Sequence, residues 1–163
     1  MDKSNKIDYI LQHITTLLTK DSDQILLEQL GIDYSQYKIL RVLYNHQEVK
    51  QRYICSVLGQ TEASISRQID ILKSKNYITK TIDLKNKRVR LIKITSKGLN
   101  ITNASTKVIE KYYKSLLEGF NDKNKQELLK LLEELHGKIC QYNHTNYLDN
   151  LNTIVSNYRS QNI

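Results

Sequence analysis

Residues 54–78 read ICSVLGQTEASISRQIDILKSKNYI. Apolar side chains recur in them at three- and four-residue steps, which predicts one short helix over about 51–58 and a second from about 61 to 75. Gly59 ends the first helix, and Thr61 is a favoured N-cap for the second. The inward-facing residues are Ile54, Val57, Leu58, Ile65, Ile69 and Leu72. Two short helices joined by so tight a connection are the arrangement of a helix-turn-helix.

A basic hairpin is predicted directly after the second helix. Residues 78–82 alternate with the two-residue period of a strand, and residues 89–95 are rich in β-branched side chains. The segment between them, 84–87, is polar and charged, as a turn requires. A helix-turn-helix followed by such a hairpin is a winged helix-turn-helix.

Helical patterns flank this unit on both sides. Apolar residues from Ile7 to Leu30 predict one long amphipathic helix that ends near Gly31. Asp33 and Gln36 have the spacing of a capping box, which begins a helix that ends around residue 45. Further helical segments are expected over 95–116, 128–142 and 147–158. The chain has 163 residues and no proline, and the expected fold class is mainly α with a small β-hairpin wing.

The net charge of the chain is concentrated in one segment. Residues 73–97 carry nine lysines and arginines against the single Asp83, and their net charge equals the +8 of the whole protein. A block of like charges contributes little to stability, because exposed ion pairs are worth only about 0–1 kcal/mol. It does create a potential that attracts a polyanion. The charge pattern therefore makes nucleic acid the first partner to consider, and the winged helix-turn-helix arrangement indicates double-stranded DNA.

The second short helix and the hairpin supply the candidate DNA-binding residues. Small and hydroxyl side chains suit close approach to a major groove, and Arg67 can contact guanine or a phosphate with both branches of its guanidinium. The candidates on the recognition helix are Thr61, Ala63, Ser64, Ser66, Arg67 and Asp70. The candidates on and near the wing are Lys80, Lys85, Lys87, Arg88 and Arg90, with Lys73, Lys75 and Lys93 as further phosphate contacts. Arg88 and Arg90 are placed to sense a narrow minor groove.

These residues resemble the helix-turn-helix of MarR-family transcriptional regulators. The positions that match the family pattern are Leu58, Gly59, Ser66, Arg67, Asp70 and Leu72. Residues 82–88 resemble the family wing, and residues 91–98 resemble the exit into its dimer helix. Residue matches cover about 33–98, and the remainder corresponds by helix order alone. The wing departs from the usual Asp-x-x-Asp-Arg-Arg, because Asn86, Lys87 and Arg88 stand there. Asn76 replaces the usual glycine after the recognition helix.

The resemblance implies a domain organisation in which separate segments dimerise and bind DNA. It implies an N-terminal dimerisation helix over 1–32, a winged helix-turn-helix domain over 33–97 and C-terminal dimerisation helices over 98–163. It also implies a ligand-responsive repressor that binds a pseudo-palindromic operator as a homodimer, with one recognition helix on each half-site. A small-molecule effector is thus an expected partner. The expected localisation is cytoplasmic, because the sequence has no membrane-length apolar run and no signal peptide.

Three features of the sequence are candidate sensors. Cys55 is expected to be a buried core residue rather than a redox centre, since a free cysteine behaves as a small hydrophobe. His136, Cys140 and His144 lie at i, i+4 and i+8 and could share a helix face, a weak candidate for zinc or copper because no fourth ligand is evident. Tyr37, Tyr112 and Tyr113 are hypothetical lining residues of an effector pocket, although tyrosines at helical spacing are more often core or interface residues. No cofactor is expected.

Two other functional classes compare differently with the sequence. A winged-helix module that uses its hairpin to hold an acidic protein partner remains open, and salt-dependent DNA binding with a sequence preference would separate it from a regulator. An enzyme is not expected, because the sequence has no glycine-rich phosphate loop, metalloprotease helix motif or nucleophile elbow.

Overall fold

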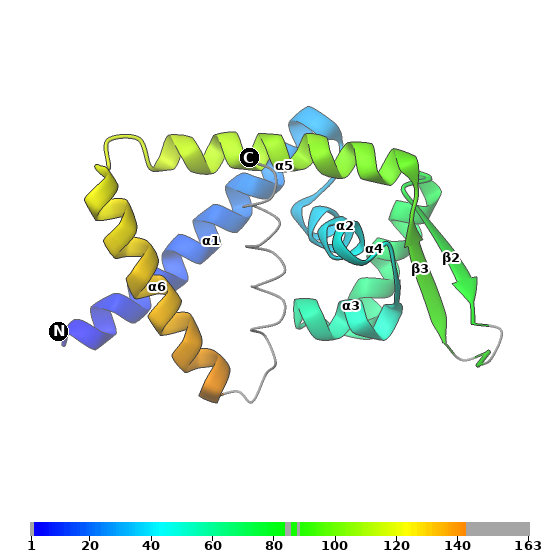
Figure 1. The fold of residues 1–163 in the computed structure, drawn as a ribbon, viewed down its shortest axis with the longest axis horizontal. Coiled ribbons are helices and arrows are strands. Elements are labelled where there is room, and N and C mark those ends of the chain that lie inside the picture. Colours follow the sequence, from blue (N-terminus) through cyan, green and yellow to red (C-terminus); the bar gives the residue numbers. More distant parts are fainter. Residues whose placement is uncertain (1, 84–85, 88, 143–163) are drawn as a thin grey trace. The chain divides into compact units, whose positions relative to one another are not determined.

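The computed structural model describes residues 2–83, 86–87 and 89–142. Its helices and strands follow one another as α1 (Lys3–Leu30), α2 (Tyr34–His46), β1 (Glu48–Lys50), α3 (Gln51–Leu58), α4 (Glu62–Ser74), β2 (Ile78–Ile82), β3 (Arg90–Ile94), α5 (Ser96–Leu116) and α6 (Asp122–Tyr142) (Figure 1). By contact the chain divides into two compact units, Met1–Tyr113 and Lys114–Ile163, which are described separately. The predicted class, mainly α with a small β wing, is confirmed.

The junction between α1 and α2 is built by local capping. Gly31 adopts a left-handed conformation with φ 66°, and its N–H donates to the Leu27 carbonyl oxygen at 3.1 Å. The Asp33 carboxylate then caps α2 by accepting the Gln36 backbone N–H at 2.7 Å. The Gln36 side chain departs from a standard capping box, because its amide donates to the Asp33 carboxylate at 2.9 Å instead of accepting from the backbone.

The sheet has three strands in the order β1-β3-β2 and is antiparallel throughout. Ile92 of β3 lies between Val49 of β1 and Lys80 of β2. The sequence predicted only the hairpin of β2 and β3, so β1 is an additional strand. The chain turns into β1 at Gln47, which has φ 61° and whose carbonyl oxygen accepts the Ile94 N–H at 3.1 Å.

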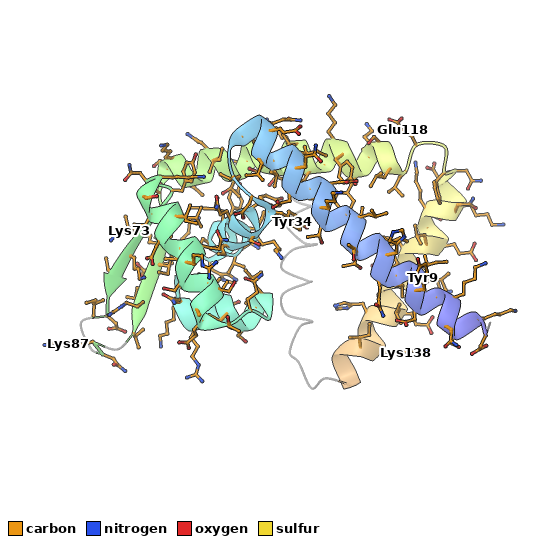
Figure 2. All side chains as sticks on the ribbon, turned by 180° about the vertical axis from the view of Figure 1, so that it is seen from behind. Tyr9, Tyr34, Lys73, Lys87, Glu118 and Lys138 are labelled. Carbon is orange, nitrogen blue, oxygen red and sulfur yellow. The ribbon has the colours of Figure 1, made fainter. Side chains whose placement is uncertain are left out.

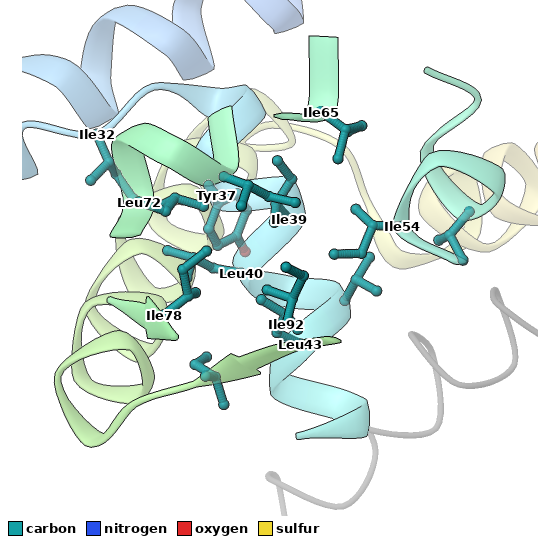
Figure 3. Close-up of a cluster of buried hydrophobic side chains, with 14 of the residues drawn as sticks. Ile32, Tyr37, Ile39, Leu40, Leu43, Ile54, Ile65, Leu72, Ile78 and Ile92 are labelled. Atoms are coloured by element: carbon teal, nitrogen blue, oxygen red, sulfur yellow. The ribbon is translucent and has the colours of Figure 1, made fainter. Parts of the chain in front are cut away.

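The core of the first unit surrounds α2. Side chains from α2, α3, α4 and the sheet meet there and are almost completely buried (Figure 3). They include Ile39, Leu40, Leu43, Ile54, Ile65, Ile69, Leu72, Ile78 and Ile92. The predicted inward faces of α3 and α4 are therefore correct, with Leu58 only partly buried. Packing against the same core fixes α4 and the hairpin in one orientation.

The second unit contributes α6, which exposes most of its apolar side chains. Leu128, Leu129, Leu131, Leu132 and Ile139 are all exposed. The predicted helical segment over 147–158 lies outside the described residues. Among the helices that the structure describes, none is long and apolar enough to cross a membrane.

Candidate nucleic-acid interface

The helix-turn-helix is formed by α3 and α4, with the bounds that the sequence predicts. Gly59 ends α3 with φ 60°, a conformation that glycine adopts without a steric penalty. The Thr61 hydroxyl accepts the backbone N–H of Ser64 at 3.2 Å and so caps α4. Thr61, a candidate for DNA contact, thus has a structural role in the described protein.

One side of α4 is exposed and nearly neutral. Ala63, Arg67 and Asp70 are exposed and Ser66 is partly exposed, while Ile65, Ile69 and Leu72 on the opposite side enter the core. Ser64, which is also exposed, flanks this side near the start of the helix. The helix brings these candidate residues together on a surface that a DNA groove can reach.

The end of α4 directs the chain into the wing. Asn76 has φ 61°, the Tyr77 N–H donates to the Leu72 carbonyl oxygen at 3.0 Å, and the Asn76 N–H donates to that of Lys73 at 2.9 Å. This pair of hydrogen bonds is a Schellman motif, in which asparagine takes the position usually held by glycine. The motif places β2 directly after the recognition helix.

The wing is tied to the recognition helix by an ion pair. The Lys80 ammonium of β2 lies 3.1 Å from Oδ1 of Asp70 on α4, with side-chain exposures of 20% and 63%. Lys87 lies at the far end of the hairpin (Figure 2). Arg90 at the start of β3 donates to the Lys87 carbonyl oxygen at 3.1 Å. Lys85 and Arg88 lie outside the described residues.

Some lysines of the basic segment 73–97 make hydrogen bonds within the protein. The Lys75 ammonium donates to the Gly31 carbonyl oxygen at 2.6 Å, and the Lys97 ammonium donates to the Lys75 carbonyl oxygen at 3.0 Å. Lys97 also lies 5.1 Å from the centre of the Tyr77 ring. The sequence did not indicate these internal partners. Lys73, Lys87, Lys93 and Arg90 are exposed among the other described members of the block.

The candidate sensing residues occupy different environments. Cys55 is buried, and burial, with a smaller contribution from the Glu62 charge, raises the pKa of its thiol. This raised pKa disfavours the reactive thiolate. His136 is partly buried, while His144 and the side chain of Cys140 lie outside the described part of the chain. In that part no three or more histidine, cysteine or acidic side chains cluster as a metal site.

The three tyrosines proposed for an effector pocket have contacts of their own. The hydroxyl groups of Tyr37 and Thr106 are 3.2 Å apart, and the Tyr112 hydroxyl donates to Asp21 at 2.7 Å. The rings of Tyr112 and Tyr113 meet edge to face at 5.4 Å. Burial, followed by the hydrogen bond to Asp21, raises the pKa of Tyr112 to about 12. The pocket remains a hypothesis.

Comparisons with known proteins agree with this geometry. A family model described as a winged helix DNA-binding domain matches residues 36–113. The uncharacterized HTH-type transcriptional regulator YdgJ of Bacillus subtilis (strain 168) is 23% identical over 109 residues, which cover 67% of this chain and 66% of YdgJ. The match thus spans slightly less than two thirds of that relative.

Solved structures share the fold at similar sequence distances. A MarR/EmrR family transcriptional regulator from Acinetobacter sp. ADP1 has a TM-score of 0.71 and 24% identity, covering 86% of this chain and 99% of that one. The MepR–DNA complex of S. aureus has a TM-score of 0.70 and 23% identity, with coverages of 80% and 96%. CouR from Rhodococcus jostii RHA1, bound to p-coumaroyl-CoA, has a TM-score of 0.67 and 20% identity, with coverages of 81% and 92%.

Proposed function

We propose that this chain is a MarR-family winged-helix transcriptional regulator which binds double-stranded DNA. The observation that carries the proposal is the exposed side of α4 beside a basic hairpin. Arg67 with Ser64 and Ser66 would read base edges in the major groove. Arg88 or Arg90 would enter the neighbouring minor groove.

The basic side chains around this surface supply affinity in the proposal. Lys73, Lys85, Lys87 and Lys93 would neutralise phosphates, which makes binding depend steeply on salt concentration. Lys80 and Lys75 are expected to act mainly through the contacts they make within the protein. MepR, which has the same fold, has been solved in complex with DNA, and this supports the assignment.

We further infer a homodimer on a pseudo-palindromic operator. The exposed apolar side chains of α1 and α6 support this part of the proposal, because large exposed apolar surfaces mark interaction sites. Each protomer would place one recognition helix in one half-site. A role as a ligand-responsive cytoplasmic repressor belongs to the same proposal, and CouR, solved with a bound ligand, supports ligand response. The family and fold are those of regulators, and we propose no catalytic activity.

Selection of duplexes from a random and a genomic DNA pool tests the proposal. The full chain should enrich one sequence with two related half-sites, and its affinity should fall steeply as salt rises. If no duplex is enriched and binding is insensitive to salt, the proposal is wrong. Retention of an acidic protein in place of DNA would then favour the alternative of a protein-interaction module.

Substitution of Arg67 tests base reading on the selected duplex. Arg67→Ala should cost about 1–3 kcal/mol at one or two operator positions and leave binding to random DNA little changed. Lys87→Ala is the matched control, since loss of a phosphate contact should weaken both duplexes alike and reduce the salt slope. Equal weakening of both duplexes by Arg67→Ala would contradict its role in base reading.

A further inference from the structure

Gln36 is a buried amide where three parts of the first unit meet. It lies in the first turn of α2, and only 4% of its surface is exposed. Its Nε2 donates to Asp33 Oδ2 at 2.9 Å and to Gln68 Oε1 at 3.2 Å. Its Oε1 accepts from the Lys75 ammonium at 3.4 Å. The side chain therefore has both donor and acceptor contacts in the interior.

The partners fix the direction of this amide. An ionised carboxylate only accepts hydrogen bonds, and an ammonium group only donates them. Nε2 must therefore face Asp33 and Oε1 must face Lys75. With the amide so oriented, a second N–H is left to reach Gln68, whose own Oε1 is held toward α2.

These partners belong to two functionally different regions. Asp33 caps α2 immediately after the end of α1, and Lys75 also donates to the Gly31 carbonyl oxygen at 2.6 Å. Gln68 lies on α4, and Lys75 directly follows the last residue of that helix, about two turns further along the same face. Gln68 directly follows Arg67, the proposed base-reading residue. The Gln36 amide thus connects the α1–α2 junction to the recognition helix.

We propose that Gln36 is a positioning residue for DNA recognition, which sets the orientation of α4 relative to the α1–α2 junction through Gln68 and Lys75. This inference rests on the proposed function. Without the amide, α4 keeps its apolar packing through Ile65, Ile69 and Leu72 but loses polar contacts that fix its rotation. Base contacts require a defined orientation of the helix, whereas phosphate contacts tolerate more displacement.

The substitution Gln36→Met tests the role while keeping a similar side-chain volume. On the selected duplex we expect affinity to fall about 2- to 30-fold, the range found for residues that modulate coupling between sites. On a scrambled duplex of equal length the loss should be clearly smaller. Ile39→Val is the matched control, because it trims the buried core on the same helix and leaves the amide network intact.

A purely structural role would give a different result. Partial unfolding removes active protein, so it would weaken the selected and the scrambled duplex by the same factor. Equal loss on both duplexes would therefore overturn the proposal. Gln68→Met removes the same hydrogen bond from the side of Gln68, which is partly buried. It should reproduce the selective loss of affinity for the selected duplex. The double variant Gln36→Met with Gln68→Met should lose no more affinity for the selected duplex than the weaker-binding of the two single variants. Additive losses of affinity would also overturn the proposal.

Hydrogen–deuterium exchange provides a test of the proposal that does not depend on DNA binding. Peptides covering 68–75 should exchange faster in Gln36→Met than in Ile39→Val, because a helix segment with fewer tertiary contacts opens more often. Unchanged exchange in these peptides would overturn the proposal. If the wild-type protein binds no duplex, the proposed function fails, and this measurement still decides whether Gln36 holds α4.

Discussion

At the scale of single residues, Gly98 is the glycine with the least room for a side chain. It lies in the first turn of α5, where a Cβ would fall well inside contact distance of the Tyr77 carbonyl oxygen and 2.8 Å from Cγ1 of Ile94. Tyr77 is held in place, because its carbonyl oxygen also accepts from Thr95 N–H at 3.0 Å. The neighbouring atoms are mostly backbone and cannot move aside alone.

We therefore expect Gly98→Ala to lower the free energy of unfolding by about 1–3 kcal/mol, as overpacking does. Urea denaturation of the two proteins measures the difference. Gly137→Ala is the control, because a Cβ there meets no atom within 4 Å. Alanine at that helical position should be stabilising by about 0.5–1 kcal/mol. Equal stability of Gly98→Ala and the wild type would show that the wing and α5 can separate.

Asp70 holds a lysine that could otherwise contact DNA. Asp70→Asn removes the ion pair with Lys80, and the exposure of Asp70 limits the stability cost to about 0–1 kcal/mol. We expect tighter binding to random DNA, with a slope of log affinity against log salt steeper by about 0.9, the value for one added phosphate contact. Titrations at several salt concentrations measure this slope.

The control for Asp70 uses a background that lacks the lysine. In Lys80→Met, the further change Asp70→Asn should leave the salt slope as it is, since no ammonium group is released. A slope that steepens equally in both backgrounds would mean that removal of the negative charge, and not release of Lys80, causes the effect.

The sequence could predict the role of a residue only where its partners are close to it along the chain. Gly59 and Thr61 act on neighbouring backbone atoms, so their capping roles followed from residue type and spacing. Lys75 and Lys80 find partners 44 and 10 residues away. Nothing in the local sequence distinguishes them from the exposed lysines beside them. Only the packing of α1, α2, α4 and β2 creates those partners.

At the scale of elements, the same reasoning explains the strand that was missed. The short segment Glu48–Lys50 contains one apolar residue and has no strand pattern of its own. It becomes β1 because Val49 pairs with Ile92 across the sheet. The hairpin and the helices were predictable, since each of them repeats its period over at least five residues.

The contact between α1 and α5 should depend on pH. The Tyr112 hydroxyl on α5 donates to Asp21 on α1 at 2.7 Å, and its pKa is raised from 10.0 to about 12. A raised pKa means that the folded state favours the neutral hydroxyl. The resulting stabilisation is complete below pH 10 and is lost as pH rises through about 12.

Tyr112→Phe should therefore lower the free energy of unfolding by about 1 kcal/mol at neutral pH, the typical value of one hydrogen bond. The difference from the wild type should narrow between pH 10 and 12. Urea denaturation at pH 8 and near pH 11 measures both values. Tyr9→Phe, at an exposed tyrosine of α1, is the control and should show no such narrowing. A difference that stays constant with pH would contradict the assigned hydrogen bond.

At the scale of the whole molecule, net charge and DNA-facing charge are different quantities. The net charge of segment 73–97 equals the net charge of the whole chain. Three of its lysines, Lys75, Lys80 and Lys97, nevertheless have partners inside the protein. The salt dependence of DNA binding should therefore report fewer phosphate contacts than the number of positive charges in the segment. Composition indicated a polyanion as the partner, while the structure indicates which side chains remain to meet it.

The assembly of the molecule is tested on α1. Ile10 and Ile14 are 42% and 46% exposed on one side of this helix, together with Ile7 and Leu17. If this side forms a dimer interface, Ile10→Glu combined with Ile14→Glu places unpaired charges in apolar surroundings, which costs several kcal/mol. Sedimentation velocity should then show monomers at concentrations where the wild type is dimeric.

Operator binding by this double variant should weaken as well, because two linked half-sites become two independent ones. Thr16→Glu is the control, since Thr16 lies on the opposite side of the same helix and is exposed. It should leave both the dimer and DNA binding intact. A double variant that remains dimeric would exclude this side of α1 from the interface, and the exposed leucines of α6 would be the next apolar surface to test.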